Sequence, residues 1–524
     1  MQRRSLMIGA AAAAFATKLS RPAIAQANAK TLRFVPQANL ANPDPVWTTT
    51  IVAANHAFMI WDQLWDFDDN LLPQPQMLAN AGTSDDKLTW TLTLREGLVW
   101  HDNEPVRSAD CIASLKRWMK RDGMGQRIDS QLNEMRVKDD KTFEIVLKKP
   151  FPLLPMALSS NCHMMPERMA KTSPFEQITE YVGSGPFRFL RNEWVSGSFA
   201  AYAKNEKYVP RAEPPSNMSG GKRVYLDRVE WHVTGDPSTA AAAIQTGEID
   251  WIEQPLADLL PALRRAPGVS VDNVDLLGSI GIIRFNELQP PFNNQKLRQA
   301  LLAITSQRDF LDAVMGNEKS LTETCGIFTP GTPLASDAGI AALTGPRDLA
   351  KAKRLVEESG YKGEKVVILD PTDFPVINAI AQVTRSLCVS LGLDVEYVAT
   401  DWGTVVSRRA SREPVEKGGW SIFLTYGDGY SFSNPATYTA LWGTGEKAWF
   451  GWPTSARIEA LRDAWYSAAD LATQQKLGRE MQLAAFEEVP FIPVGLWHQP
   501  IARRDNITGI LKAARPVFWE VKKS

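Results

Sequence analysis

The sequence predicts a mixed α/β fold, in which strands and helices alternate along the chain. Period-two patterns typical of strands are interleaved with the spacing typical of helices, and the turns between them carry glycine and proline, as at 183–186 and 289–291. The 524 residues are enough for roughly three domains of about 150 residues each. Because no internal repeat and no flexible linker divides the chain, we expect its domains to be discontinuous in sequence.

Residues 1–25 are expected to be an export signal. Arg3 and Arg4 precede a mostly apolar run over 6–16, and the small residues Ala23 and Ala25 frame a cleavage site. The arginine pair is typical of a twin-arginine signal; the alternative is an ordinary secretory signal that carries two arginines. Either signal places the mature chain in the periplasm. The first cysteine, Cys111, is too far from the cleavage site to carry a lipid anchor.

The charge balance excludes some classes of partner. The chain has 58 basic and 59 acidic residues, a net charge of −1. The signal holds four of the basic residues and no acids, so the mature chain carries −1 − 4 = −5. A weakly acidic chain does not attract nucleic acid over a wide surface, and no later apolar run reaches the roughly 18 residues of a membrane span. We expect a soluble mature protein.

Three period-two patterns predict half-buried strands, at 88–94, 143–147 and 229–233. Helical spacing predicts helices over 297–304 and 310–314. Two further helices, over 348–359 and 377–391, are each followed by a glycine that can adopt the left-handed conformation of a helix end.

Two other segments have a telling composition. Residues 455–488 are rich in Ala, Leu, Glu, Gln and Arg and predict one or two long helices. Residues 214–221 are rich in Pro, Ser and Gly and predict a long surface loop.

No catalytic motif is found. The chain lacks a GxSxG elbow, an HExxH motif, a GxGxxG strand–helix turn and a complete Walker loop, so we expect neither an enzyme nor a bound cofactor. His163, beside two methionines, is the best metal-ligand candidate, although a packed core histidine is the more ordinary interpretation. The four cysteines are widely spaced. The sequence is compatible with one or two disulfides and equally with buried free thiols.

Several strings resemble a known family. Residues 84–102, continued by Glu104–Asp110, are similar to a stretch of the extracytoplasmic solute-binding proteins, family 5, which serve ABC importers of oligopeptides, dipeptides and nickel. The same order of similarity continues in Val137–Glu144 with Pro150–Pro152, in Gly183–Phe187, and then in Phe285–Asn286, Pro290–Phe292 and Arg298–Leu301. The colinear order of these strings carries the resemblance.

This resemblance implies a periplasmic binding protein-like fold with two lobes, an extra domain in the N-terminal half, and a ligand cleft between the lobes. It places lobe I at 26–60, 185–277 and 495–524, the extra domain at 61–184, and lobe II at 278–494. Such lobes hinge over their ligand and close on it. The implied partners are a small peptide or peptide-like ligand and the permease subunits of the inner membrane, with the protein itself a monomer.

The resemblance also implies site residues. In peptide-binding relatives an aspartate in the C-terminal lobe holds the ammonium end of the peptide, and Asp428, with Tyr426 beside it, matches that stretch. The alternative is that Asp428 only shapes a glycine-rich turn. The segment 369–376 has two acids and no base, so a strict dipeptide clamp is not expected there. Arg408 and Arg409 lie near Tyr426 and Asp428 in sequence, and Arg409 is the candidate substitute for such a carboxylate clamp; the alternative is that this basic pair lies on a solvated helix face.

Tryptophan is abundant, with 17 residues. Most are expected in the core, but aromatic walls also suit ligands that have apolar bodies or cationic groups. Trp442 and Trp452 lie in glycine-rich segments and are candidates for ligand contact.

The leading hypothesis is therefore a periplasmic substrate-binding component of an ABC importer for a small peptide or a similar solute. The alternative cargo is a metal chelate, haem, an opine or another amino-acid-derived solute. A periplasmic hydrolase or sensor partner on the same fold is the alternative from another class.

Overall fold

Three larger β-sheets organise the protein, and each forms the centre of one structural unit. The computed structural model describes residues 30–159, 161–275, 277–468, 470–513 and 515–524. The expected export signal therefore lies outside the described residues. Within those ranges, no helix combines the length and the apolar character needed to cross a membrane.

The first unit, called lobe I here, is built on a seven-stranded sheet of order β12-β19-β11-β1-β10-β9-β8. Its strands are β1 (Thr31–Val35), β8 (Phe187–Phe189), β9 (Phe199–Lys204), β10 (Arg228–His232), β11 (Trp251–Ile252), β12 (Val269–Asp272) and β19 (Ile501–Arg504). Its helices are α2 (Ile51–Ile60), α7 (Pro237–Thr246) and α8 (Leu260–Leu263). Strands from both ends of the chain thus meet in one sheet, with β1 parallel to β10 and β19 antiparallel to β11.

The second unit, lobe II, is built on a six-stranded sheet of order β14-β18-β13-β17-β15-β16. Its strands are β13 (Ser279–Phe285), β14 (Thr322–Glu323), β15 (Val366–Pro371), β16 (Val395–Thr400), β17 (Ile422–Asp428) and β18 (Phe491–Trp497). Its helices are α9 (Gln295–Ile304), α10 (Gln307–Met315), α11 (Ala341–Thr344), α12 (Leu349–Ser359), α13 (Pro375–Ser390), α14 (Trp402–Arg408), α15 (Ala456–Ser467) and α16 (Leu471–Glu488). The central strands β13 and β18 are buried along their whole length, as strands covered on both faces must be.

The third unit, the insert domain, is an antiparallel sheet of order β4-β5-β7-β6. Its elements are β4 (Leu78–Thr83), β5 (Thr89–Leu94), α3 (Ser108–Met119), α4 (Gly123–Gln131), β6 (Leu132–Val137), β7 (Thr142–Leu147), α5 (Leu154–Leu158) and α6 (Glu167–Ala170). Two small ribbons complete the strands, β2 (Trp65–Phe67) with β3 (Pro73–Pro75) and β20 (Ile507–Thr508) with β21 (Lys522–Lys523). Short 3-10 helices lie at Arg191–Glu193, Ala257–Leu259, Lys319–Leu321, Val415–Lys417, Thr439–Leu441 and Gly445–Lys447.

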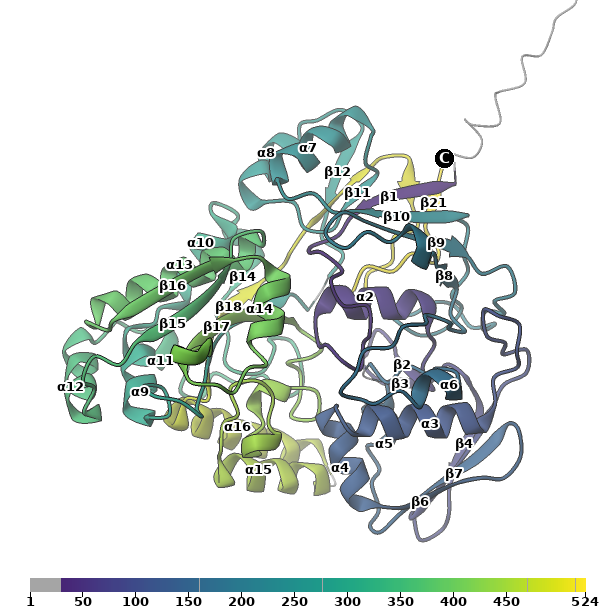
Figure 1. Ribbon diagram of the computed structural model, residues 1–524, viewed down its shortest axis with the longest axis horizontal. Coiled ribbons are helices and arrows are strands. Elements are labelled where there is room, and N and C mark those ends of the chain that lie inside the picture. The colour runs from purple at the N-terminus through teal and green to yellow at the C-terminus, as the bar shows by residue number, and fades with distance from the viewer. Residues whose placement is uncertain (1–29, 160, 276, 469, 514) are drawn as a thin grey trace, which may run out of the picture.

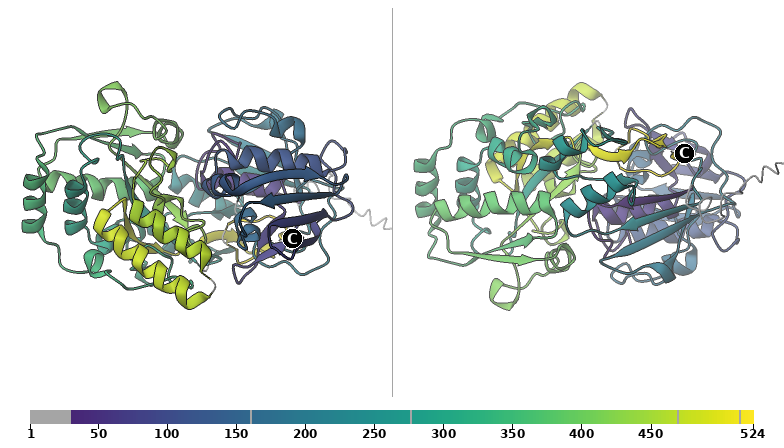
Figure 2. Two further views of the ribbon diagram at one scale, coloured as in Figure 1. Left: turned by 90° about the horizontal axis from the view of Figure 1, so that it is seen from below. Right: turned by 90° about the horizontal axis from the view of Figure 1, so that it is seen from above.

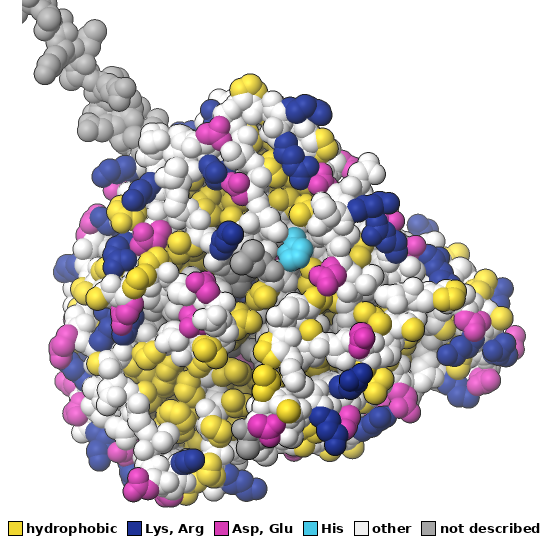
Figure 3. Space-filling view, turned by 180° about the vertical axis from the view of Figure 1, so that it is seen from behind, with side chains coloured by type: hydrophobic (Ala, Val, Ile, Leu, Met, Phe, Trp, Pro, Cys, Tyr) yellow, Lys and Arg dark blue, Asp and Glu magenta, His cyan; other side chains and the backbone are white. Residues whose placement is uncertain are grey.

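The three units surround a central region (Figure 1). Lobe II lies on the left in this view. On the right, lobe I lies above the insert domain, and α2 lies between these two units. The views from below and above show the same separation of lobe II from the other two units (Figure 2). On the rear face, acidic and basic side chains are interspersed between hydrophobic patches (Figure 3), in keeping with the near-zero net charge.

The predicted elements are confirmed. The three strand patterns correspond to β5, β7 and β10, and the helical patterns to α9, α10, α12 and α13. Gly360 adopts φ 73° at the end of α12, and Gly392 adopts φ 78° just beyond α13. The composition of 455–488 corresponds to two helices, α15 and α16.

The predicted surface loop over 214–221 is wrong in its second half. Asn217–Gly221 are buried, because the next residue, Lys222, is drawn into the interior. Its Nζ lies 2.9 Å from Asp62 Oδ1 and 2.8 Å from Asp66 Oδ2, and none of the three side chains is exposed. A buried ammonium must be paired, and this pairing brings the loop inward with it.

Candidate ligand-binding site

A cavity lies where the three units meet. Its volume is about 160 Å³. Its walls come from the segment after β1 and the start of α2 in lobe I, from the α3–α4 corner of the insert domain, and from β17, α13 and α14 of lobe II. We call it the first cavity. Because all three units contribute, its shape depends on the lobes being closed against each other.

Tyr426 and Asp428 reach this cavity from the end of β17. This strand is buried between β13 and β15, so its C-terminal residues lie at the end of an interior strand of lobe II. The Tyr426 hydroxyl donates to Gln37 Oε1 and accepts from Gln254 Nε2 at 2.9 Å. Gln37 follows β1 and Gln254 follows β11. Tyr426 therefore connects lobe II to lobe I.

Asp428 is already paired with a cation. Its Oδ2 lies 2.8 Å from Arg515 Nη2, and both side chains are almost fully buried. The contact is not aligned as a hydrogen bond, since Oδ2 has no hydrogen-bond partner in the described ranges of the chain. Oδ1 accepts from the Ser431 backbone N–H at 2.8 Å. Asp428 thus faces the cavity and also shapes the turn after β17.

Arg409, directly after α14, also lines the first cavity. It is 2% exposed, so it is not on a solvated helix face. The only hydrogen bond that its side chain makes within the described chain is from Nη2 to Thr49 Oγ1 at 3.3 Å, and its Nε has no partner there. The guanidinium lies over aromatic rings, with Phe450 at 4.7 Å.

No carboxylate among the described residues forms an ion pair with Arg409, and burial lowers its pKa to about 9. The side chain therefore remains a cation at neutral pH while lacking a counter-ion. A buried cation in this state is stabilised by an anion that enters the cavity.

A smaller cavity of about 60 Å³ adjoins the first one. The two share five lining residues, which are Gln37, Ile51, Tyr426, Asp428 and Arg515. This second cavity extends into lobe I, where it is lined by Glu253 and Asp275. Burial raises the pKa of both carboxyls to about 7. The pair of cavities is therefore basic near Arg409 and acidic near Glu253.

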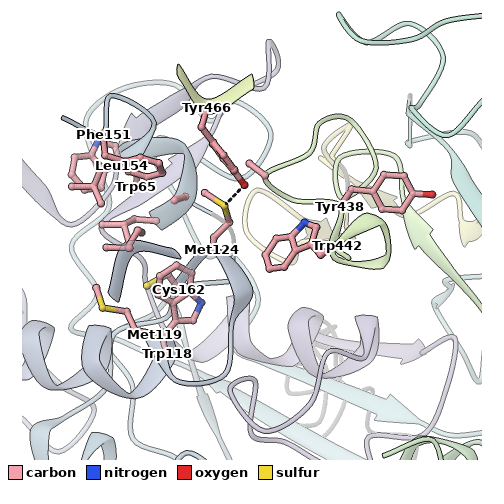
Figure 4. Packing of buried hydrophobic residues seen from close by; sticks show 14 of the residues in the cluster. Trp65, Trp118, Met119, Met124, Phe151, Leu154, Cys162, Tyr438, Trp442 and Tyr466 are labelled. Carbon is pink, nitrogen blue, oxygen red and sulfur yellow. Dashed lines mark hydrogen bonds between the residues drawn. The ribbon is translucent and has the colours of Figure 1, made fainter. Parts of the chain in front are cut away.

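Trp442 and Trp452 are not among the lining residues of either cavity. Trp442 is 4% exposed and belongs to the hydrophobic cluster that joins lobe II to the insert domain. Figure 4 shows it facing Met124, whose sulfur accepts a hydrogen bond from Tyr466 at 2.9 Å. Trp452 packs against Trp420 in the core of lobe II, with ring centroids 6.0 Å apart. Ligand contact remains a prediction for all five residues singled out from the sequence.

The histidine and cysteine candidates lie in the interior. All four cysteines are free and buried. His163 is 2% exposed, and burial lowers its pKa to about 3. Among the described residues, no three His, Cys, Asp or Glu side chains are placed to hold a metal ion.

Residues 73–449 match the profile of the bacterial extracellular solute-binding proteins, family 5 Middle. The chain belongs to this family. A curated member, the probable peptide ABC transporter periplasmic-binding protein y4tO of Sinorhizobium fredii, is 40% identical over 530 residues, covering all of both chains.

Solved structures of the family share the two-lobed fold. The periplasmic binding protein AgaA of A. tumefaciens, in complex with agropinic acid, has a TM-score of 0.80 at 20% identity, covering 94% of this chain and 99% of that one. DppA of Helicobacter pylori, in complex with the peptide STSA, has a TM-score of 0.77 at 19% identity, covering 95% and 99%. The predicted fold is confirmed.

Family resemblance pointed to Asp428, but three charged residues beside it were missed. Arg515, Glu253 and Asp275 lie in segments with no recognisable motif, far from Asp428 in sequence. Only the pairing of chain-distant strands in lobe I, such as β11 with β19, brings these segments together.

Proposed function

We propose that this family 5 protein binds a small peptide or peptide-like solute in the cleft and delivers it to the permease of an ABC importer. The observation that carries the proposal is Arg409, a buried cation in a cavity between the lobes that has no counter-ion among the residues the structure describes. A free carboxylate on the solute would supply the missing charge. The cavity is smaller than the roughly 300–1,000 Å³ of typical ligand pockets, which favours a short solute.

In this proposal the protein is exported, acts in the periplasm as a monomer and catalyses no reaction. An opine-like amino acid derivative is the second candidate cargo. The likeness of fold to AgaA with agropinic acid and the small volume of the cavity favour it.

The experiment compares a synthetic tripeptide pool with the same pool amidated at its carboxyl ends. Thermal-shift measurements on the purified protein report binding, because a ligand of the native state raises the melting temperature. We expect the free pool to stabilise the protein, and we expect amidation or Arg409→Met to reduce the affinity about tenfold or more.

Arg408→Met is the matched control. Arg408 is the last residue of α14 and precedes Arg409, but its guanidinium donates to the carbonyls of Gly418 and Gly419. The control should bind the free pool as the wild type does. Equal binding of free and amidated pools by the wild type would remove Arg409 as the carboxylate site, and binding of an opine alone would select the second cargo.

A further inference from the structure

The second cavity holds more negative than positive charge. Its lining has three carboxylates, Glu253, Asp275 and Asp428, and one guanidinium, Arg515. With all four groups ionised the charge is −3 + 1 = −2. Arg515 forms its ion pair with Asp428. Among the described residues, neither Glu253 nor Asp275 has a cation within ion-pair distance, and Arg515 acts on both only from farther away. In their ionised forms the two acids therefore leave this cavity with an excess of negative charge.

The hydrogen bonds that Glu253 and Asp275 accept do not supply a positive charge. Glu253 accepts from the Gln37 backbone N–H at 2.7 Å and from Asn55 Nδ2 at 3.0 Å, and Asp275 Oδ1 accepts from the Leu277 N–H at 3.0 Å. All three donors are neutral. Burial accordingly raises the pKa of both carboxyls to about 7. A cation that enters the cavity would favour their ionised forms.

An independent observation concerns Arg515. This side chain is 8% exposed and lines both cavities. Its Nη1 has no hydrogen-bond partner in the described part of the protein. A buried donor left without an acceptor costs about 1–3 kcal/mol, and the side chain that carries this donor lines both cavities. A ligand that fits this site would therefore carry an acceptor oxygen for Arg515 Nη1 and, close to it, a cationic group for the two acids.

An α-ammonium next to a carbonyl oxygen has both features, and it occurs at the first residue of every unblocked peptide. A cavity of about 60 Å³ has room for a group of this size, since a water molecule occupies about 30 Å³ in the liquid.

We propose that the ammonium group of the solute binds in the second cavity, where Glu253 and Asp275 supply the negative charge and Arg515 Nη1 donates to the adjacent carbonyl oxygen. Asp428, neutralised by Arg515, then holds the arginine in place and is not the ion-pair partner of the ammonium. This inference rests on the proposed function. It also orients the solute, with its ammonium in lobe I and its carboxylate at Arg409.

The test uses the tripeptide pool and the same pool acetylated at its amino ends. Acetylation removes the positive charge and leaves the carboxylate. We expect it to weaken binding to the wild type about tenfold or more. The double variant Glu253→Gln/Asp275→Asn should bind both pools equally, whereas Asp428→Asn should still prefer the free pool.

Glu287→Gln is the control for loss of a buried carboxyl. Glu287 is in lobe II, outside both cavities, and burial raises its pKa to about 7 as well. This variant should keep the full preference for the free pool. The comparison of the two pools on the wild type tests the inference even where a variant fails to fold.

Two results would overturn the inference alone. One is equal binding of free and acetylated pools by a wild type that still discriminates against amidated peptides. The other is loss of the preference in Asp428→Asn together with its survival in the double variant. Absence of binding to every pool would overturn the proposed peptide cargo and the inference with it.

Discussion

Some buried charged side chains in the cleft have an oppositely charged partner, and others do not. Asp428 and Arg515 balance each other at 2.8 Å, whereas Arg409 and Glu253 have only neutral partners among the described residues. Unbalanced buried charges cost free energy in the empty protein. They are therefore the positions at which a solute of complementary charge gains most.

The carboxyl of Glu253 should make the ligand-free protein less stable as the pH rises. Burial raises its pKa from 4.5 to about 7, so between these values the folded state binds more protons than the unfolded state. The stabilisation that comes from protonated Glu253 is fully present below about pH 4.5. It decreases as the pH rises from there and is lost once the pH has passed about 7. The full change corresponds to about 3 kcal/mol.

Urea unfolding of the wild type and of Glu253→Gln, at intervals between pH 5 and pH 8, measures this effect. We expect the wild type to lose stability relative to the variant over that interval. Arg515 and Asp275 face the same cavity and are unchanged in both proteins, so the difference reports Glu253. Parallel stability curves would contradict the assignment.

Residue-level prediction succeeded where local sequence carried a signal. Tyr426, Asp428 and Arg409 all line the first cavity, although their contact with a ligand is still a prediction. Trp442 and Trp452 lie outside it because large aromatic rings are most stable in the core, and sequence context alone does not separate a core ring from a cavity wall. Arg515 had no local signal at all.

The helices α9, α10, α12, α13, α15 and α16 and the half-buried strands β5, β7 and β10 followed from local patterns, since one face of each is apolar or its composition favours a helix. The seven-residue strands β13, β17 and β18 were not predicted, because a strand buried on both faces has no period-two pattern. The two-residue strands β11 and β14 were not predicted. Such short strands depend on a neighbouring strand for their hydrogen bonds and leave no periodic pattern of their own.

Helix α4 begins where the insert domain contacts lobe II, and Gly123 is its first residue. A Cβ placed on Gly123 would lie 1.3 Å from Trp442 Cζ3. We therefore expect Gly123→Ala to push α4 away from lobe II and to cost about 1–3 kcal/mol through overpacking. Thermal unfolding and the radius of gyration from small-angle X-ray scattering measure the two effects.

Gly82→Ala is the matched control for this variant. Gly82 lies in β4 of the same domain, and a Cβ there would meet no atom within 4 Å. The control should resemble the wild type in shape. A wild-type radius and melting temperature for Gly123→Ala would show that the contact with Trp442 does not hold the domains together.

Contacts between the units determine the shape of the whole cleft. Tyr426 joins lobe II to Gln37 and Gln254 of lobe I. Thr49 Oγ1 accepts from both Arg409 and Trp449 Nε1, the latter at 3.4 Å. All of these contacts would separate if the lobes opened, so they stabilise the closed arrangement.

Tyr426→Phe should weaken ligand binding by favouring the open arrangement. The variant removes the hydroxyl that bridges the lobes, and a typical hydrogen bond contributes about 0.5–1.5 kcal/mol. With two such bonds lost, we expect the affinity for the free peptide pool to fall about five- to a hundredfold. Calorimetric titration of each protein measures the change.

Tyr438→Phe provides the comparison, because the buried Tyr438 hydroxyl has no hydrogen-bond partner among the described residues. It should bind the pool with wild-type affinity. If Tyr426→Phe did the same, the bridge would not contribute to closure.

The division into lobe I, extra domain and lobe II at the stated residues stays a prediction. The strands are distributed in agreement with it, since the seven-stranded sheet draws on residues 31–35, 187–272 and 501–504. Family resemblance, not composition, supplied those boundaries.

Amino-acid order alone settled the class of fold, several of the helices and half-buried strands, and the family, because periodic patterns and colinear motifs are local properties of a chain. The tertiary structure decided the arrangement of charges in the cleft. Arg515 lies beside Asp428, and within the described part of the chain Glu253 has no cation and Arg409 no acid within ion-pair distance. Each of these facts depends on which distant segments are brought within a few ångströms of each other, and on the water that their packing excludes.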